Sequence, residues 1–122
     1  MNPRENEDAA FDKAADAVLR QIERAVSVFD PDEIEAELAQ DVLTLTHQTG
    51  QKIVINRHRA ARQMWMAALR KAWHFTPQSS AGSSDAETVF EVWKSSSGDE
   101  LWQTLETVLS SLVRRPISLK RT

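Results

Sequence analysis

The sequence contains no cysteine, and this absence removes a large part of protein chemistry from consideration. Without a thiol there is no disulfide, no thiolate nucleophile and no thiolate-bound metal. Apolar runs are short as well, because no stretch approaches the roughly 18 residues that a membrane span requires. The acidic residues 1–13 lack the apolar segment of a signal peptide. These absences predict a cytoplasmic protein that does not associate with membranes.

Sequence motifs of catalysis and nucleotide binding are also missing. There is no G-x-S-x-G, no G-x-G-x-x-G and no P-loop. The histidines His47, His58 and His74 lack the spacing of a metal-binding pair, so each is expected to be a surface or packing residue. His58 is in addition a candidate for a partner contact. The sequence therefore predicts a binding protein rather than an enzyme.

Charge is divided unevenly along the 122 residues, although the net charge is only −3. Residues 1–41 carry 12 acidic and 4 basic side chains, whereas residues 42–122 carry 6 and 11. An acidic surface repels nucleic acid and attracts cations or basic proteins, so no nucleic-acid partner is expected. The alternative is that the imbalance serves only solubility. A basic group in the second part is expected to contact acidic groups of a protein partner: Arg57, Arg59, Arg62, Arg70 and Lys71.

The first half of the chain predicts a helix followed by a hairpin. Residues 8–29 place apolar side chains at helical spacing, and Asp30-Pro31 is expected to end the helix. Strands are predicted from alternating and β-branched residues on either side of 47–51, which contains a glycine suited to a hairpin turn.

The second half predicts further strands and a second helix. Residues 63–68 fit either a strand or a helix, while 73–75 and 88–93 are predicted strands. A helix is expected to begin after an N-cap within 95–100 and to end before Pro116. The apolar tail at 117–119 is expected to fold back onto the core.

Short links between strands predict an antiparallel sheet, with two helices on one face and the other face open to water. The prediction is a single α+β domain over residues 1–122, a two-layer α-β sandwich. Residues 1–8 and the Ser/Gly/Pro-rich 76–87 are expected to be mobile.

Two rows of carboxylates are predicted to lie side by side, and we call them together the acidic ridge. The first row follows one stripe of the first helix: Asp12, Asp16, Glu23 and Asp30. The second row alternates along the first strand and its flanks: Glu33, Glu35, Glu37 and Asp41. Like charges this close repel one another, and hard cations or a basic partner relieve the repulsion. A solvated face that binds nothing is the alternative.

Trp65 lies between Met64 and Met66, so it faces the open side of the sheet if the two methionines face the core. An exposed tryptophan is a common anchor for a protein partner, although a single exposed apolar residue is also normal. The remaining tryptophans are expected to be buried or half-buried: Trp73, Trp93 and Trp102.

Four segments together resemble the bacterial frataxin family, the CyaY proteins. They are Ile55-Asn56-Arg57, Gln63-Met64-Trp65-Met66-Ala67, Trp73-His74-Phe75 and Ser97-Gly98-Asp99-Glu100-Leu101. The likeness spans about residues 11–119. It implies the fold predicted above. It also implies an iron-binding accessory protein that regulates iron–sulfur cluster assembly and docks on a cysteine desulfurase and its scaffold protein.

Carried over by position, the resemblance implies two sets of site residues. The metal ligands would be Asp16, Glu23, Asp30, Asp32, Glu33, Glu35 and Glu37, and they would bind Fe²⁺ or Fe³⁺, or other divalent cations, weakly at the surface. The partner surface would include Asn56, Gln63 and Trp65. The implied protein is a monomer that forms oligomers, if at all, with iron. Ferroxidase or iron-storage activity and a metal-independent interaction module remain the alternatives.

The chain departs from the family pattern at several places. His58-Arg59-Ala60 stands where the family has Gln-x-Pro after Asn-Arg. Arg24, Ser27 and Val28 stand where carboxylates are common near the end of the first helix, so the acidic ridge is thinner here.

Overall fold

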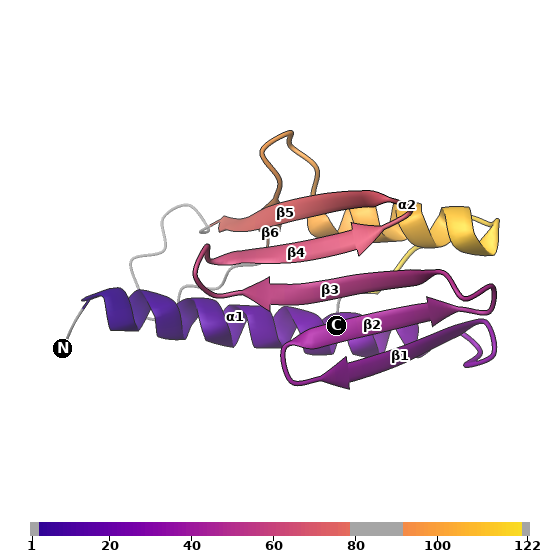
Figure 1. The fold of residues 1–122 in the computed structure, drawn as a ribbon, viewed down its shortest axis with the longest axis horizontal. Coiled ribbons are helices and arrows are strands. Elements are labelled where there is room, and N and C mark those ends of the chain that lie inside the picture. Colours follow the sequence, from indigo (N-terminus) through magenta and orange to yellow (C-terminus); the bar gives the residue numbers. More distant parts are fainter. Residues whose placement is uncertain (1–2, 79–91, 121–122) are drawn as a thin grey trace.

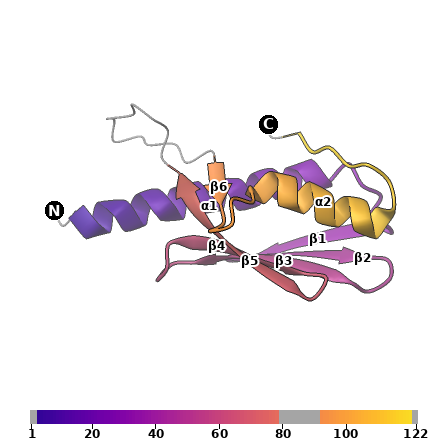
Figure 2. The ribbon, with the colours of Figure 1, turned by 90° about the horizontal axis from the view of Figure 1, so that it is seen from above.

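The protein is a two-layer sandwich of helices on a sheet, described by a computed structural model over residues 3–78 and 92–120. Its elements are α1 (Pro3–Val26), β1 (Ile34–Ala39), β2 (Val42–His47), β3 (Lys52–His58), β4 (Gln63–Ala68), β5 (Lys71–Gln78), β6 (Val92–Lys94) and α2 (Leu101–Val113). The strands form one six-stranded antiparallel sheet in sequence order. Both helices lie on the same face of it (Figures 1 and 2), as predicted.

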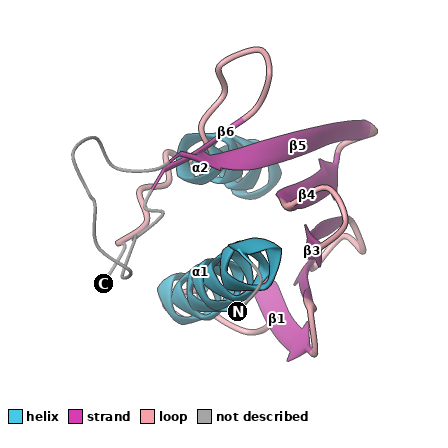
Figure 3. Cartoon of the chain, turned by 90° about the vertical axis from the view of Figure 1, so that its left-hand side faces the viewer, coloured by secondary structure: helices cyan, strands magenta, loops and turns pink. Residues whose placement is uncertain are grey.

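Seen end-on, the sheet curves around the two helices (Figure 3). The edge strand β1 lies beside α1, and the opposite edge strand β6 lies beside α2. Side chains from both layers form one core, whose largest fully buried members include Phe11, Ile22, Phe75, Trp93 and Trp102. In the described part of the chain, neither helix is long and apolar enough to cross a membrane.

Helix α1 follows the predicted apolar stripe but not the predicted ends. It begins at Pro3 rather than at residue 8 and stops at Val26, three residues before the predicted end. Ser27 donates its hydroxyl and its backbone N–H to the carbonyl of Arg24, and this local bonding competes with a further helical turn. Phe29 is still buried, but from a turn rather than from the helix.

Side chains alternate between the two faces of the sheet along each strand. In β4 the side chains of Met64, Met66 and Ala68 are buried, so residues 63–68 form a strand and not a helix. In the turn between β2 and β3, Gly50 has φ +92°, which glycine adopts without strain. The predicted hairpin is therefore confirmed.

The boundaries after β4 differ from prediction. Strand β5 extends over Lys71–Gln78, so residues 76–78, which were expected to be a mobile loop, belong to the sheet. The strand expected at 88–93 is described only as Val92–Lys94. The rest of both predictions, 79–91, lies outside the described residues.

Helix α2 is capped at both ends by its own sequence. The Glu100 carboxylate accepts hydrogen bonds from the N–H groups of Trp102 and Gln103, which makes Glu100 the N-cap. At the other end Arg114 adopts a left-handed conformation with φ 60°, and its N–H bonds to the carbonyl of Ser110. The helix therefore stops at Val113, three residues before Pro116.

The C-terminal tail returns along α2, as predicted. The N–H of Ile117 donates to the Ser110 hydroxyl, at 2.9 Å, and the N–H of Leu119 donates to the Glu106 carboxylate, at 2.7 Å. The Leu119 side chain is buried in the core.

We predict that Leu119→Ala lowers the free energy of unfolding by about 2 kcal/mol, because it removes buried apolar volume. Ser118→Ala, which changes an exposed neighbour in the same tail, serves as the control and is expected to change little. Urea unfolding measures both. Equal effects of the two variants would contradict a tail that is docked through Leu119.

Candidate functional site

The face of the sheet turned away from the helices is covered by no other described element, and we call it the outer face (Figure 2). Register places Asn56, Trp65 and His74 side by side across β3, β4 and β5. His58 and Gln63 form the next cross-strand pair. Because Met64 and Met66 are buried against the helices, Trp65 faces outward, which confirms the predicted orientation.

Trp65 is held between two imidazole rings. The His58 ring lies 3.9 Å from the Trp65 ring, centroid to centroid, with 9° between the planes. The His74 ring lies 4.2 Å away on the other side, with 15° between the planes. Parallel rings at these distances are stacked, and we call the three residues the His–Trp–His stack.

Hydrogen bonds fix the stack on the sheet. The indole N–H of Trp65 donates to the Gln63 side-chain oxygen at 3.0 Å, and the Gln63 amide donates to the Thr76 hydroxyl at 3.3 Å. The N–H of Ala61, in the turn between β3 and β4, donates to Nδ1 of His58 at 3.2 Å. Hydrogen bonds therefore restrain the indole at its N–H and the His58 ring at its Nδ1.

The sequence predicted Trp65, Asn56 and Gln63 on this face. It also gave His58 as a candidate partner contact, but it did not predict that His58 and His74 stack on Trp65. His74 lies directly opposite Trp65 on β5. On β3 the residue opposite Trp65 is Asn56, and His58 lies two residues further along that strand, on the same face. The signal was present in principle, because aromatic cross-strand pairs stabilise a sheet. The contacts of the two histidines with Trp65 can be predicted only when the register of β3, β4 and β5 is known.

The N-terminal part of the acidic ridge is already paired with arginines. The Arg59 guanidinium bonds both oxygens of Asp12, at 3.2 and 2.6 Å, and Arg62 bonds Asp8 at 2.8 Å. Arg57 lies between α1 and the start of β2 and pairs with Asp12 and with Asp41. These three arginines were expected to face a protein partner, and instead they bind the carboxylates of their own chain.

Two of the predicted metal ligands also have ion-pair partners. Asp16 accepts a hydrogen bond from Arg20, one helical turn further on, at 2.9 Å. Glu33 receives both arms of the Arg115 guanidinium, each at 2.7 Å. This bidentate bond holds the pKa of Glu33 below its ordinary value of 4.5.

Five predicted ligands have no ion pair among the residues that the structure describes: Glu23, Asp30, Asp32, Glu35 and Glu37. Asp30 was predicted to lie on the stripe of the first helix, but α1 ends at Val26. Asp30 starts the turn into β1, where its carboxylate accepts the N–H of Asp32 at 2.9 Å.

The ridge is therefore broken into separate parts. Glu35 and Glu37 lie on the outer face at the β1 edge, where they alternate with Ile34, Ala36 and Leu38, which turn toward the core. Within 3–78 and 92–120, no three carboxylate or imidazole groups lie close enough to hold one metal ion. Any cation at these carboxylates is bound by few protein oxygens and mostly by water.

The architecture is that of a two-layer α-β sandwich of the frataxin type. The family model described as a frataxin-like domain matches residues 4–115, so the chain belongs to this family, as the sequence resemblance implied. A solved structure of frataxin from Psychromonas ingrahamii, studied as a model within the CyaY protein family, matches with a TM-score of 0.72. The match covers 91% of this chain and 95% of that chain at 21% sequence identity, which shows a shared fold.

We predict that Glu33→Gln destabilises the protein near neutral pH and has a shrinking effect as the pH falls below 4.5. The pKa of Glu33 is lower in the folded protein than in the unfolded chain. Ionised Glu33 therefore stabilises the folded state at every pH above the pKa that it has in the unfolded chain. That contribution is lost as the pH falls through the folded pKa. Thermal unfolding measured from pH 7 down to pH 3 tests this.

Two further variants sharpen the test. Arg115→Gln is expected to give the same pH profile, and the double variant is expected to be less destabilised than the sum of the two single changes. Lys120→Gln removes another exposed cation of the tail and serves as the control, with an effect that does not follow the titration of Glu33. Additive single effects would contradict a working ion pair.

Proposed function

We propose that the protein is a non-enzymatic regulator of iron–sulfur cluster assembly that docks on the cysteine desulfurase and its scaffold protein through the outer face. The observation that carries the proposal is the His–Trp–His stack, a restrained aromatic surface that no other described element covers. Membership of the frataxin-like family supports this assignment, because the family resemblance implies a partner surface that includes Trp65.

The stack has the properties of an interface anchor. Tryptophan is among the residues that contribute most to protein–protein affinity, because it offers a large apolar area with few rotatable bonds. Here the indole is only partly buried and its orientation is set by Gln63 and by the two imidazoles. A partner that binds this side chain therefore loses little free energy to ordering it.

Charge at the β1 edge supplies a second contact on the same face. Glu35 and Glu37 are exposed there, and β1 lies three strand spacings from β4, about 14 Å. That separation fits within a standard protein interface. The partner would then present basic groups beside a site for the aromatic stack, and its affinity would decrease with salt.

Iron, as Fe²⁺ or Fe³⁺, is proposed to bind the unpaired carboxylates at the β1 edge and near the end of α1. Carboxylates of this kind are the oxygen ligands that hard cations accept. Without three converging groups in the described chain, the binding would be weak and shared with other divalent cations. Weak binding suits a protein that releases its metal to a partner.

A metal-independent interaction module is the second candidate, and the ion pairs favour it. Asp8, Asp12, Asp16, Glu33 and Asp41 each have an arginine partner, so much of the negative charge that was expected to attract iron is already neutralised. In this version the outer face alone carries the function.

We predict that Trp65→Ala weakens binding to a purified cysteine desulfurase by about tenfold or more, because the anchor is lost. Val28→Ala, which shortens an 81% exposed apolar side chain away from the outer face, is the control and is expected to bind normally. Biolayer interferometry, with circular dichroism as a check of folding, measures the effect. Equal affinities of the two variants would rule out docking through Trp65.

We predict that Fe²⁺, added without oxygen, broadens the amide NMR signals of Glu35 and Glu37 before those of the paired Asp12. Paramagnetic Fe²⁺ broadens the signals of nearby nuclei, and free carboxylates bind it more readily than carboxylates engaged by arginine. Glu35→Gln combined with Glu37→Gln is expected to abolish this broadening. Signals that remain sharp at millimolar Fe²⁺ would refute the metal role and leave the interaction module.

A further inference from the structure

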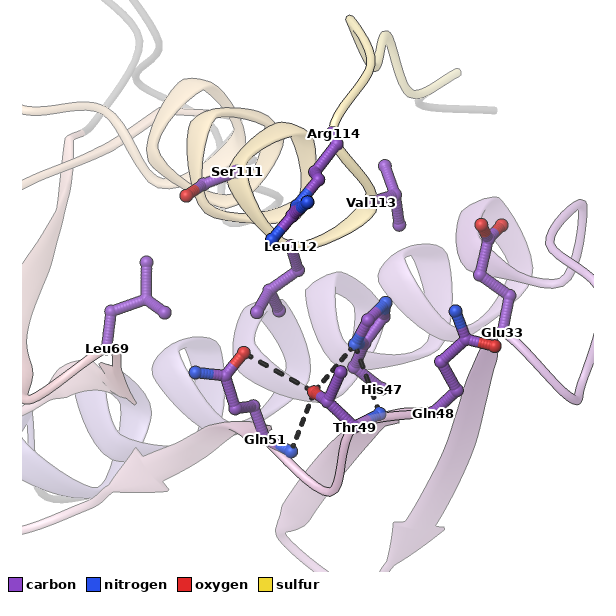
Figure 4. Close-up of a pocket in the computed structure, with 10 residues that line it drawn as sticks. All are labelled: Glu33, His47, Gln48, Thr49, Gln51, Leu69, Ser111, Leu112, Val113 and Arg114. Carbon is purple, nitrogen blue, oxygen red and sulfur yellow. Dashed lines mark hydrogen bonds between the residues drawn. The ribbon is translucent and has the colours of Figure 1, made fainter.

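A pocket of about 460 Å³ lies at one end of the domain, away from the outer face (Figure 4). It is bounded by the tip of the β2–β3 hairpin, the turn after β4 and the C-terminal end of α2. Pockets of a few hundred cubic ångströms are the size that small organic ligands occupy in proteins. The charge and the hydrogen-bonding groups of the side chains that line this pocket indicate which chemical class of ligand fits it.

His47 is a polar residue buried at the base of this pocket, with 5% of its surface exposed. Its Nδ1 accepts a hydrogen bond from the N–H of Thr49 at 3.3 Å and lies 2.8 Å from the Thr49 hydroxyl. A backbone N–H can only donate, so Nδ1 carries no proton when the imidazole is neutral. The proton then lies on Nε2.

Nε2 of His47 is directed into the pocket and has no hydrogen-bond partner among the described residues (Figure 4). Glu33 lines the same pocket, but both of its oxygens are bonded to Arg115. No described residue, Glu33 included, accepts a hydrogen bond from the Nε2–H of His47. Among the described residues, Trp93 Nε1 is the fully buried side-chain nitrogen without a partner, so Nε2 of His47 is open to the pocket, where water or a ligand oxygen can accept its hydrogen bond.

Arg114 gives the pocket a positive charge. Its side chain lines the pocket and has no ion pair within 3–78 and 92–120. The C-terminal end of α2 contributes a partial charge of only about −0.5, so the guanidinium outweighs it. The Gln48 amide and the Ser111 hydroxyl are further donors on the wall.

We propose that this pocket binds a small organic anion through a carboxylate or phosphate group, which accepts hydrogen bonds from Nε2 of His47 and from Arg114. Both groups offer several acceptor oxygens and a negative charge, as these donors require. The proposal is independent of docking through the outer face, because none of the pocket residues belongs to the His–Trp–His stack.

The test is a titration of the ¹⁵N-labelled protein with citrate and, separately, with inorganic phosphate, at constant ionic strength set with sodium chloride. We expect saturable shifts of the Gln48, Thr49 and Ser111 amides and of the His47 ring nitrogens. Before any ligand is added, the ring signals are expected to show the proton on Nε2. Stronger binding of citrate would indicate an organic carboxylate, and stronger binding of phosphate a phosphorylated ligand; either result supports the site.

Two arginine variants separate the pocket from general charge attraction. Arg114→Gly and Arg70→Gly each remove one cation from a left-handed position, with φ 60° and 64°, where glycine is favoured, so both are expected to fold. Only Arg114 lines the pocket. We expect Arg114→Gly to weaken binding about tenfold or more and Arg70→Gly to leave it nearly unchanged.

His47→Asn provides a second probe, because the asparagine oxygen still accepts the Thr49 N–H while the Nε2 donor is lost. We expect weakened binding of citrate and phosphate with an unchanged Trp65 interface. The proposal is overturned if neither anion gives saturable shifts, if the two arginine variants lose affinity equally, or if the His47 proton lies on Nδ1. Loss of desulfurase binding by Trp65→Ala would be unaffected by any of these results.

Discussion

The cross-strand register of β3, β4 and β5 is the constraint on which the rest of the structure depends. Because side chains alternate between the two faces of a strand, burying Met64 and Met66 under the helices turns Trp65 outward. A slip of one residue would reverse every side chain of β4 and expose the methionines. The same apolar contacts that stabilise the fold therefore present the His–Trp–His stack to a partner.

Arginine placement changes what the acidic half of the chain can do. The segment from β3 into the following turn contributes three arginines to carboxylates of α1 and of the β1–β2 turn, and Arg115 reaches Glu33 across 82 residues of sequence. Solvent screens the pairs that are open to water, so each of those stabilises the fold only slightly. Their larger consequence is electrostatic, since they leave free negative charge mainly at the β1 edge and near the end of α1.

Three separate surfaces follow from this arrangement. The outer face offers an aromatic anchor and two free carboxylates, the N-terminal half of α1 is tied down by ion pairs, and the far end of the domain holds the His47 pocket. Each surface uses a different interaction: apolar contact, charge pairing and directed hydrogen bonding. A partner on the outer face and a small anion in the pocket would therefore not compete for the same atoms.

Local pattern determined the element types, the antiparallel sandwich, the inward methionines, the outward Trp65 and the family, because periodicity and short motifs are properties of neighbouring residues. It misplaced the end of α1, where Ser27 bonds Arg24, and it left residues 63–68 open between strand and helix. Only the tertiary structure decided which carboxylates stay free, how two histidines meet Trp65, and that His47 faces a pocket with Arg114. Those features join residues far apart in sequence, and contacts of that kind depend on strand register and helix placement, which no local pattern encodes.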